Sequence, residues 1–152
     1  GALFSCVGVL YDRMHTRRIS DYGGVANTMP WLAAFWILFS MANSGLPGTS
    51  GFVGEFMIIL ASFQQHPLIA FAAATTLMIG AGYSLWLAKR VIWGDVGNAH
   101  VAELKDINMR EWIVLGVFAA GVLLIGLWPK PLTDLMEPSI AQLAAQLAAS
   151  KL

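Results

Sequence analysis

The chain has 152 residues, of which 57% are hydrophobic and 12% are charged, and its formal net charge is zero. Soluble domains carry roughly twice that charged fraction, so the composition indicates an integral membrane protein. A neutral chain offers no electrostatic case for binding nucleic acid. The single cysteine, Cys6, excludes an internal disulfide, a CxxC redox pair and a cysteine-held iron–sulfur cluster within this chain.

The chain opens inside an apolar run, residues 1–10, and its first residue is Gly1 rather than Met. A membrane span needs about 20 apolar residues, so this run is too short to cross a bilayer. It also lacks the basic start of a signal peptide. We therefore expect the end of a transmembrane helix, and a chain that is a fragment of a longer protein.

Three long apolar stretches follow, over residues 30–63, 67–88 and 111–128. The second and third have the length of ordinary membrane spans. The first has 34 residues. As one straight helix it would rise about 51 Å, against a hydrocarbon core of roughly 30 Å. The first stretch therefore predicts a helix that is interrupted within the membrane.

The predicted interruption is the segment Gly45-Leu-Pro-Gly-Thr-Ser-Gly51. Its helix-breaking residues are Gly45, Pro47, Gly48 and Gly51. Proline lacks a backbone N–H and glycine favours non-helical backbone, so no helix would carry this segment intact. We expect half-helices over 30–44 and 52–63, joined by a non-helical stretch over 45–51 that is buried in protein, because lipid offers backbone groups no partner.

The basic residues alternate between the connections. Residues 11–28 contain three arginines, and residues 64–66 contain no Lys or Arg. Residues 89–110 contain four Lys or Arg residues. By the positive-inside rule, the two basic connections are cytoplasmic and the carboxyl terminus lies on the other side. Only Lys130 and Lys151 follow the last span.

The pattern changes over residues 132–150, where leucines, a methionine and an isoleucine recur at three- and four-residue steps between polar residues. This spacing predicts an amphipathic terminal helix that lies along the membrane surface or on a partner. Pro138 is a candidate for a kink in it.

Glu55 is the only Asp, Glu, Lys or Arg between Asp21 and Lys89. An ionisable group in a membrane span costs about 2.5–3.5 kcal/mol on insertion scales and is a functional hypothesis by default. Transporters also use broken helices to expose helix ends and carbonyl groups to an ion or proton path. We therefore interpret Glu55 as a group that binds and releases protons. The alternative is a permanently paired carboxylate beside a break that only serves packing.

The other candidates are weaker. His66 lies in the predicted outer turn and is a possible outer-side proton exit, although a lone histidine in a turn is more often a solvated residue. The glycines around the break do not form a phosphate loop, because no GK[ST] follows them. The sequence contains no metal-ligand cluster and no cofactor-binding loop.

Three segments carry a resemblance to a known family. They are Leu10-Tyr-Asp-Arg-Met-His-Thr-Arg17, Tyr22-Gly-Gly24 and the stretch from Gly45 to Phe56, with Gly-Leu-Pro-Gly followed by Phe-x-Gly-Glu. They resemble the closing third of the M-type antiporter-like subunits of bacterial NADH-quinone oxidoreductase, the family of subunit 4 of mitochondrial complex I. The resemblance covers nearly the whole chain and is weakest in the terminal helix.

The resemblance implies an all-α integral membrane fold. The chain would be the C-terminal part of a fourteen-helix antiporter-like fold, built from two inverted five-helix repeats that each contain a discontinuous helix. Glu55 matches the acidic residue of the second discontinuous helix, where sister subunits usually carry lysine. That residue is proposed in the family to exchange protons with the outer side.

The resemblance further implies a proton-translocating, non-redox subunit in the inner (plasma) membrane. It would adjoin other membrane subunits of complex I, including antiporter-like paralogues, and the lipid bilayer, with no nucleic acid. We expect no cofactor in this chain; NADH, FMN, iron–sulfur clusters and quinone would belong to other subunits. Two alternatives stay open: a non-conducting structural membrane subunit, and the related subunit of a cation/proton antiporter or membrane-bound hydrogenase.

Overall fold

The structure, a computed structural model, describes residues 1–150, apart from the side chains at 148 and 150. This described part is helical and contains no strand. Its elements are α1 (Ala2–Met14), the 3-10 helix η1 (Ile19–Asp21), α2 (Val25–Thr28), α3 (Pro30–Asn43), α4 (Ser50–Gln65), α5 (Pro67–Val91), α6 (Ala99–Ala102), α7 (Met109–Leu127) and α8 (Lys130–Ser150). Lys151 lies outside the described residues.

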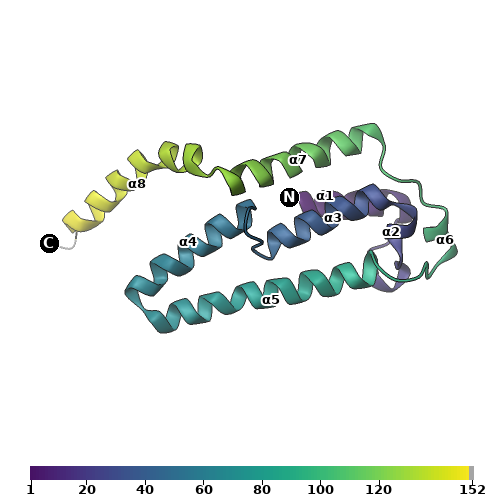
Figure 1. Cartoon of the computed structure of the whole chain (residues 1–152), viewed down its shortest axis with the longest axis horizontal. Coiled ribbons are helices and arrows are strands. Elements are labelled where there is room, and N and C mark those ends of the chain that lie inside the picture. Colours follow the sequence, from purple (N-terminus) through teal and green to yellow (C-terminus); the bar gives the residue numbers. More distant parts are fainter. Residues whose placement is uncertain (151–152) are drawn as a thin grey trace.

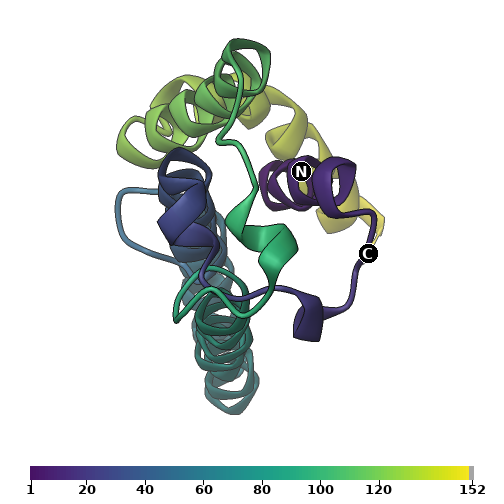
Figure 2. The same ribbon diagram turned by 90° about the vertical axis from the view of Figure 1, so that its right-hand side faces the viewer.

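The long helices lie roughly along one axis. α3 and α4 follow one another, and α5 returns beside both of them (Figure 1). α7 packs against α1, α3 and α4, and α8 continues beyond the end of α7 (Figure 1). Seen along the axis, α1 and α7 lie on one side of α3 and the α4–α5 pair extends to the other (Figure 2). The connections 15–29 and 92–108 meet at one end of the molecule, opposite the α4–α5 turn.

Local sequence signals set several helix boundaries. Pro30 and Pro67 occupy the first turns of α3 and α5, where a missing N–H costs nothing. α7 begins with a capping box, in which the Asn108 side chain accepts from the backbone N–H of Glu111 and the Glu111 carboxylate accepts from that of Asn108. Two helices are longer than the sequence predicted. α1 continues beyond residue 10 to Met14, and α5 continues beyond residue 88 to Val91.

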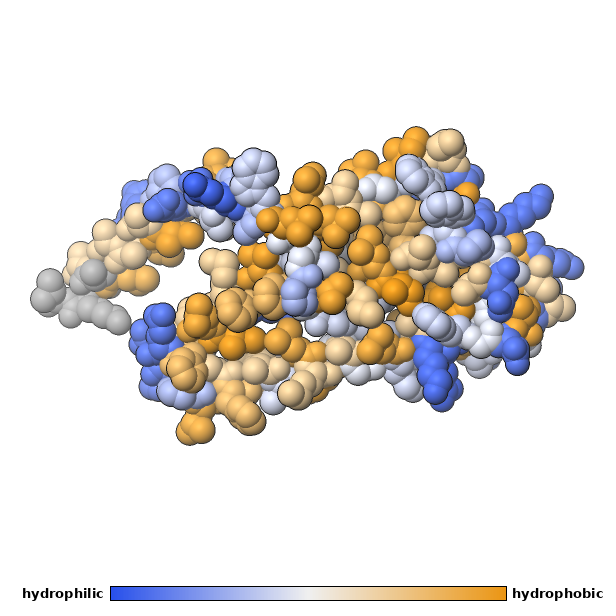
Figure 3. Space-filling model, in the orientation of Figure 1, coloured by the Kyte–Doolittle hydropathy of each residue, from blue (hydrophilic) through white to orange (hydrophobic). Residues whose placement is uncertain are grey.

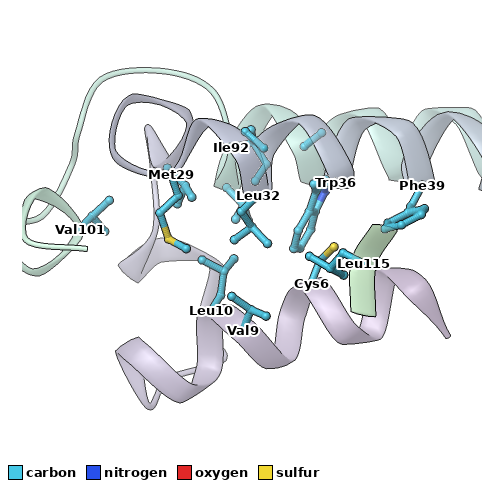
Figure 4. Close-up of a cluster of buried hydrophobic side chains, with 14 of the residues drawn as sticks. Cys6, Val9, Leu10, Met29, Leu32, Trp36, Phe39, Ile92, Val101 and Leu115 are labelled. Carbon is cyan, nitrogen blue, oxygen red and sulfur yellow. The ribbon is translucent and has the colours of Figure 1, made fainter. Parts of the chain in front are cut away.

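The buried core lies at the end of the molecule that holds the long connections (Figure 4). α1 contributes Cys6 and Leu10, α3 contributes Leu32 and Trp36, and α7 contributes Leu115, all at most 2% exposed. By contrast, α4 has no buried residue. One half of the molecule is therefore held by its own core, and the other half exposes apolar side chains.

Apolar surface covers the middle of the molecule and hydrophilic residues gather at its two ends (Figure 3). α5 and α7 are each long and apolar enough to cross a membrane, and α3 is a shorter apolar helix. A bilayer would match this pattern, with its hydrocarbon core around the apolar middle and water at both ends.

An ion pair joins α1 to α7 at the core end. The Arg13 guanidinium donates to both carboxylate oxygens of Glu111, at 2.9 and 2.7 Å, and also to the carbonyls of Val9, Lys105 and Asp106. Bidentate, charge-assisted bonds of this kind are among the stronger hydrogen bonds in proteins. Arg13 therefore fixes the long connection before α7 onto α1.

The same connection caps α3. The Asp106 carboxylate accepts hydrogen bonds from the backbone N–H groups of Trp31 and Leu32, at 2.9 and 3.3 Å, in the first turn of that helix. A carboxylate suits the positive end of a helix dipole and satisfies N–H groups that have no partner within the helix.

Replacing Arg13 tests this arrangement. Arg13→Met should lower the free energy of unfolding by about 2–3 kcal/mol, because Glu111 loses two charge-assisted bonds while four-fifths of the carboxylate side chain stays covered. Arg17→Met is the matched control, since Arg17 is exposed and only stacks on Tyr11. Thermal denaturation of the intact purified protein measures both. Equal midpoints in the two variants would contradict the role given to Arg13.

Candidate functional site

The interruption between α3 and α4 is a short segment, Ser44–Thr49, with a well-defined backbone. Gly45 has a left-handed φ of 74°, its N–H donates to the carbonyl of Ala42, and the N–H of Leu46 donates to that of Met41. This pair of bonds is a Schellman motif, which ends a helix at a left-handed glycine.

A tight turn over residues 46–49 follows. Thr49 N–H donates to the Leu46 carbonyl at 3.1 Å, with Pro47 and Gly48 between them and a φ of 90° at Gly48. Proline followed by a positive-φ glycine is the sequence of a type II turn. Thr49 is extended and its hydroxyl also donates to the Leu46 carbonyl, after which α4 begins at Ser50.

This geometry corrects the expected bounds of the interruption. Ser50 and Gly51 belong to α4, and the non-helical residues are 44–49 rather than 45–51. The physical reason is that Thr49 already has the extended backbone of an N-cap, so the next residue can start the helix. Gly51 serves close packing instead, since a side chain there would overlap the Ala42 carbonyl oxygen.

Glu55 lies on α4 and its carboxylate reaches back to the interruption. A methyl group built on Gly45 would lie 2.7 Å from Glu55 Oε2 and 2.8 Å from Cδ2 of Leu77 on α5. Oε2 is buried and has no hydrogen-bond partner among the described residues. A buried carboxylate oxygen normally has a hydrogen-bond partner, so Oε2 is placed to accept a hydrogen bond from outside the described residues.

Polar side chains tie the end of α3 to α5 near the same place. The Asn43 amide donates to the Tyr83 hydroxyl at 2.9 Å and to the Ser84 hydroxyl at 3.3 Å. Asn43 was not among the candidates from the sequence. Its position directly before the helix-breaking segment was the available signal, because an asparagine there can bond across to a neighbouring helix.

The structure does not bring His66 to Glu55. His66 is exposed at the turn between α4 and α5, eleven residues after Glu55. At about 1.5 Å per helical residue this is a separation of roughly 16 Å. The described residues hold no group of three or more His, Cys, Asp or Glu side chains placed to bind a metal ion.

Comparison of the sequence with known proteins identifies the family to which this chain belongs. Residues 1–80 match the family described as NADH:quinone oxidoreductase/Mrp antiporter, TM. The matched residues include both halves of the interrupted helix and Glu55. The chain belongs to this family. It is therefore an all-α antiporter-like integral membrane protein that crosses the membrane more than once.

Relatives within the family are similar over almost the whole chain. The chain is 47% identical over 143 residues to NADH-quinone oxidoreductase subunit M of Rhodobacter capsulatus, covering 94% of this chain and 28% of that protein. It is 44% identical to NADH-ubiquinone oxidoreductase chain 4 of Arabidopsis thaliana, covering 93% and 29%. The chain thus spans less than a third of the length of these relatives.

A solved structure has the same arrangement of helices. A chain of respiratory complex I from Thermus thermophilus with bound NADH superposes with a TM-score of 0.77 at 33% identity, over 88% of this chain and 28% of that one. Because 88% of the chain is covered, the similarity in fold and in sequence extends well beyond residues 1–80.

We expect a side chain at position 45 to destabilise the protein. Gly45→Ala forces a left-handed backbone on alanine, which costs about 1–2 kcal/mol, and its methyl group would press on the Glu55 carboxylate and Leu77. We expect a lower yield of folded protein and a lower melting temperature in detergent. Gly54→Ala is the control, because Gly54 lies on α4 with no atom within 4 Å of an added methyl group. Equal stability of the two variants would contradict the contact.

Proposed function

We propose that this chain is the closing part of a proton-translocating membrane subunit of NADH:quinone oxidoreductase, in which Glu55 carries protons. The observation that supports the proposal best is Oε2 of Glu55, which is buried beside the interrupted helix and has no hydrogen-bond partner within the described part of the chain. The M-type assignment is further supported by the 47% identity to a subunit M. By the resemblance, a sister subunit would carry lysine at this place.

The surroundings of Glu55 suit reversible protonation. Oε2 of Glu55 and Cδ2 of the apolar Leu77 both lie within 3 Å of the point that a methyl group on Gly45 would occupy, so the carboxylate lies at the interruption and next to α5. The interruption also leaves helix ends and backbone carbonyls beside this carboxylate, as broken membrane helices do along ion and proton paths. A carboxylate in this position could take up a proton from one side of the interruption and pass it on from the other.

Glu55 also lies in the half of the membrane suited to outer-side exchange. α4 runs from the interruption to the turn at residues 64–66, which has no Lys or Arg, while the Lys- and Arg-containing connections lie at the opposite end. If those connections are cytoplasmic, Glu55 and the exposed His66 both lie on the outer side, and the carboxyl terminus faces outward too. His66 is then a candidate for the surface where protons leave.

Within the complex this chain would perform no redox step. NADH oxidation and quinone reduction, with FMN and iron–sulfur clusters, would take place in other subunits, and their energy would reach Glu55 through neighbouring membrane subunits, including antiporter-like paralogues. The inner membrane is the expected location. The family also includes the Mrp antiporter, so a cation/proton antiporter subunit is a second candidate.

Substitution of Glu55 tests the proposal. Glu55→Gln in the intact complex should leave assembly unchanged and reduce proton pumping, because the amide keeps the shape of the side chain but cannot lose a proton. Glu55→Asp should retain part of the pumping, since the acid survives on a shorter arm. Pumping is measured as pH change in inverted vesicles, per assembled complex and per NADH oxidised.

Two outcomes would count against proton transfer by Glu55. Normal pumping by a fully assembled Gln variant would rule it out. Loss of assembly in the Gln variant would favour the structural alternative, in which a buried carboxylate has a permanent partner that its removal leaves uncompensated.

The orientation is tested separately by single cysteines on the two ends. Gln65→Cys should react with a membrane-impermeant thiol reagent only from the outer side, and Val96→Cys only from the cytoplasm, since both positions are exposed and lie at opposite ends. The native Cys6 is buried and provides the background. Labelling of Gln65→Cys only from the cytoplasm would reverse the proposed topology.

A further inference from the structure

The last turn of α7 rests directly on the interruption between α3 and α4. The contact is made by Gly126, the penultimate residue of α7, against the backbone of Gly48 and Thr49. A side chain on Gly126 would overlap the carbonyl oxygen of Gly48 and the Cα and carbonyl carbon of Thr49. In Figure 1 this end of α7 lies over the junction of α3 and α4.

The contact depends on this particular glycine. Gly121, one and a half turns earlier on the same helix, has no atom within 4 Å of an added methyl group. The next residue after Gly126 continues the contact, because Cδ2 of Leu127 would lie 3.7 Å from a methyl group on Gly48. α7 thus approaches the break, near its own end, too closely to leave room for a side chain at Gly126.

Thr49, the residue under Gly126, determines where α4 starts. It is 2% exposed, its backbone is extended, and its hydroxyl donates to the Leu46 carbonyl at 2.7 Å. Glu55 follows six residues later on the same continuous helix. Since a helix moves nearly as a rigid body, a shift of Thr49 carries Glu55 with it, while Gly45 stays attached to the end of α3.

We infer that Gly126 is a positioning residue for the Glu55 site. The absence of a side chain at Gly126 lets α7 seat against Gly48 and Thr49, and this seat sets how closely the Glu55 carboxylate approaches Gly45 and Leu77. Only the expected effect of Gly126 on pumping rests on the proposed function. The placement of Glu55 is a separate, measurable quantity.

The placement is tested by the reaction of Glu55 with a hydrophobic carbodiimide, which modifies carboxylic acids in apolar surroundings. Gly126→Ala and the control Gly121→Ala are compared with the unmodified protein in the intact complex. Both substitutions replace a glycine of α7 by alanine, and only the first inserts a methyl group into the contact. The adduct on Glu55 is quantified by mass spectrometry, and Glu55→Gln establishes that the signal comes from this residue.

We expect Gly126→Ala to change the rate of labelling at Glu55 and Gly121→Ala to leave it unchanged. Equal rates in all three proteins would overturn the inference. Should Gly126→Ala not assemble, Leu127→Ala tests the same seat, because it removes the neighbouring contact with Gly48 without inserting atoms. An unchanged rate in an assembled Leu127→Ala variant would likewise overturn it.

Pumping gives the functional consequence. A displacement of roughly 1 Å can slow a positioned reaction by on the order of a hundredfold, so we expect at least about a tenfold loss of pumping per assembled Gly126→Ala complex, with a shifted pH profile. A loss that only follows the amount of complex, at an unchanged pH profile, would show a structural role and overturn the inference. Normal pumping by Glu55→Gln, together with altered labelling in Gly126→Ala, would refute the proposed function and retain the positioning role.

Discussion

The structure depends on one constraint, that backbone N–H and C=O groups inside a membrane need partners from the protein itself. The interruption between α3 and α4 meets part of this need within six residues. A Schellman motif at Gly45 closes α3, and a turn through Pro47 and Gly48 leads to Thr49, which opens α4. Because the segment bonds to itself, the helix can stop and restart at membrane depth, and Glu55 on the new helix can turn its carboxylate toward the old one.

The two ends of the molecule are stabilised in different ways. At the connection end, a buried core and the Arg13–Glu111 pair hold α1, α3 and α7 together, and Asp106 caps α3. At the other end, α4 has no buried residue and side chains such as Leu68 remain exposed. Apolar side chains of this kind suit contact with lipid or with further membrane helices. The interruption lies between the stable end and the open one, which is where a proton site can be both anchored and accessible.

Much of the architecture could be predicted from the sequence, because length, hydropathy and helix-breaking residues are local properties. The long spans, the interruption near residue 45 and the position of Glu55 all followed from such signals. The bounds shifted by two residues at Ser50 and Gly51, since an N-cap depends on backbone angles that composition does not specify. The amphipathic terminal stretch forms α8, with Pro138 inside it, and its contact with membrane or partner remains a prediction.

The sequence by itself determined that a lone carboxylate would lie beside a broken membrane helix, because one charge and a run of glycine and proline can be read without knowing any contact. Only the tertiary structure decided what surrounds that carboxylate. Glu55 Oε2 and Leu77 leave no room for a side chain at Gly45, Asn43 bonds to Tyr83 and Ser84, and α7 reaches the break through Gly126. These contacts join residues that are up to 78 positions apart, as between Gly48 and Gly126, and no local pattern encodes them. They arise because small residues let membrane helices approach one another closely, while larger side chains keep them apart.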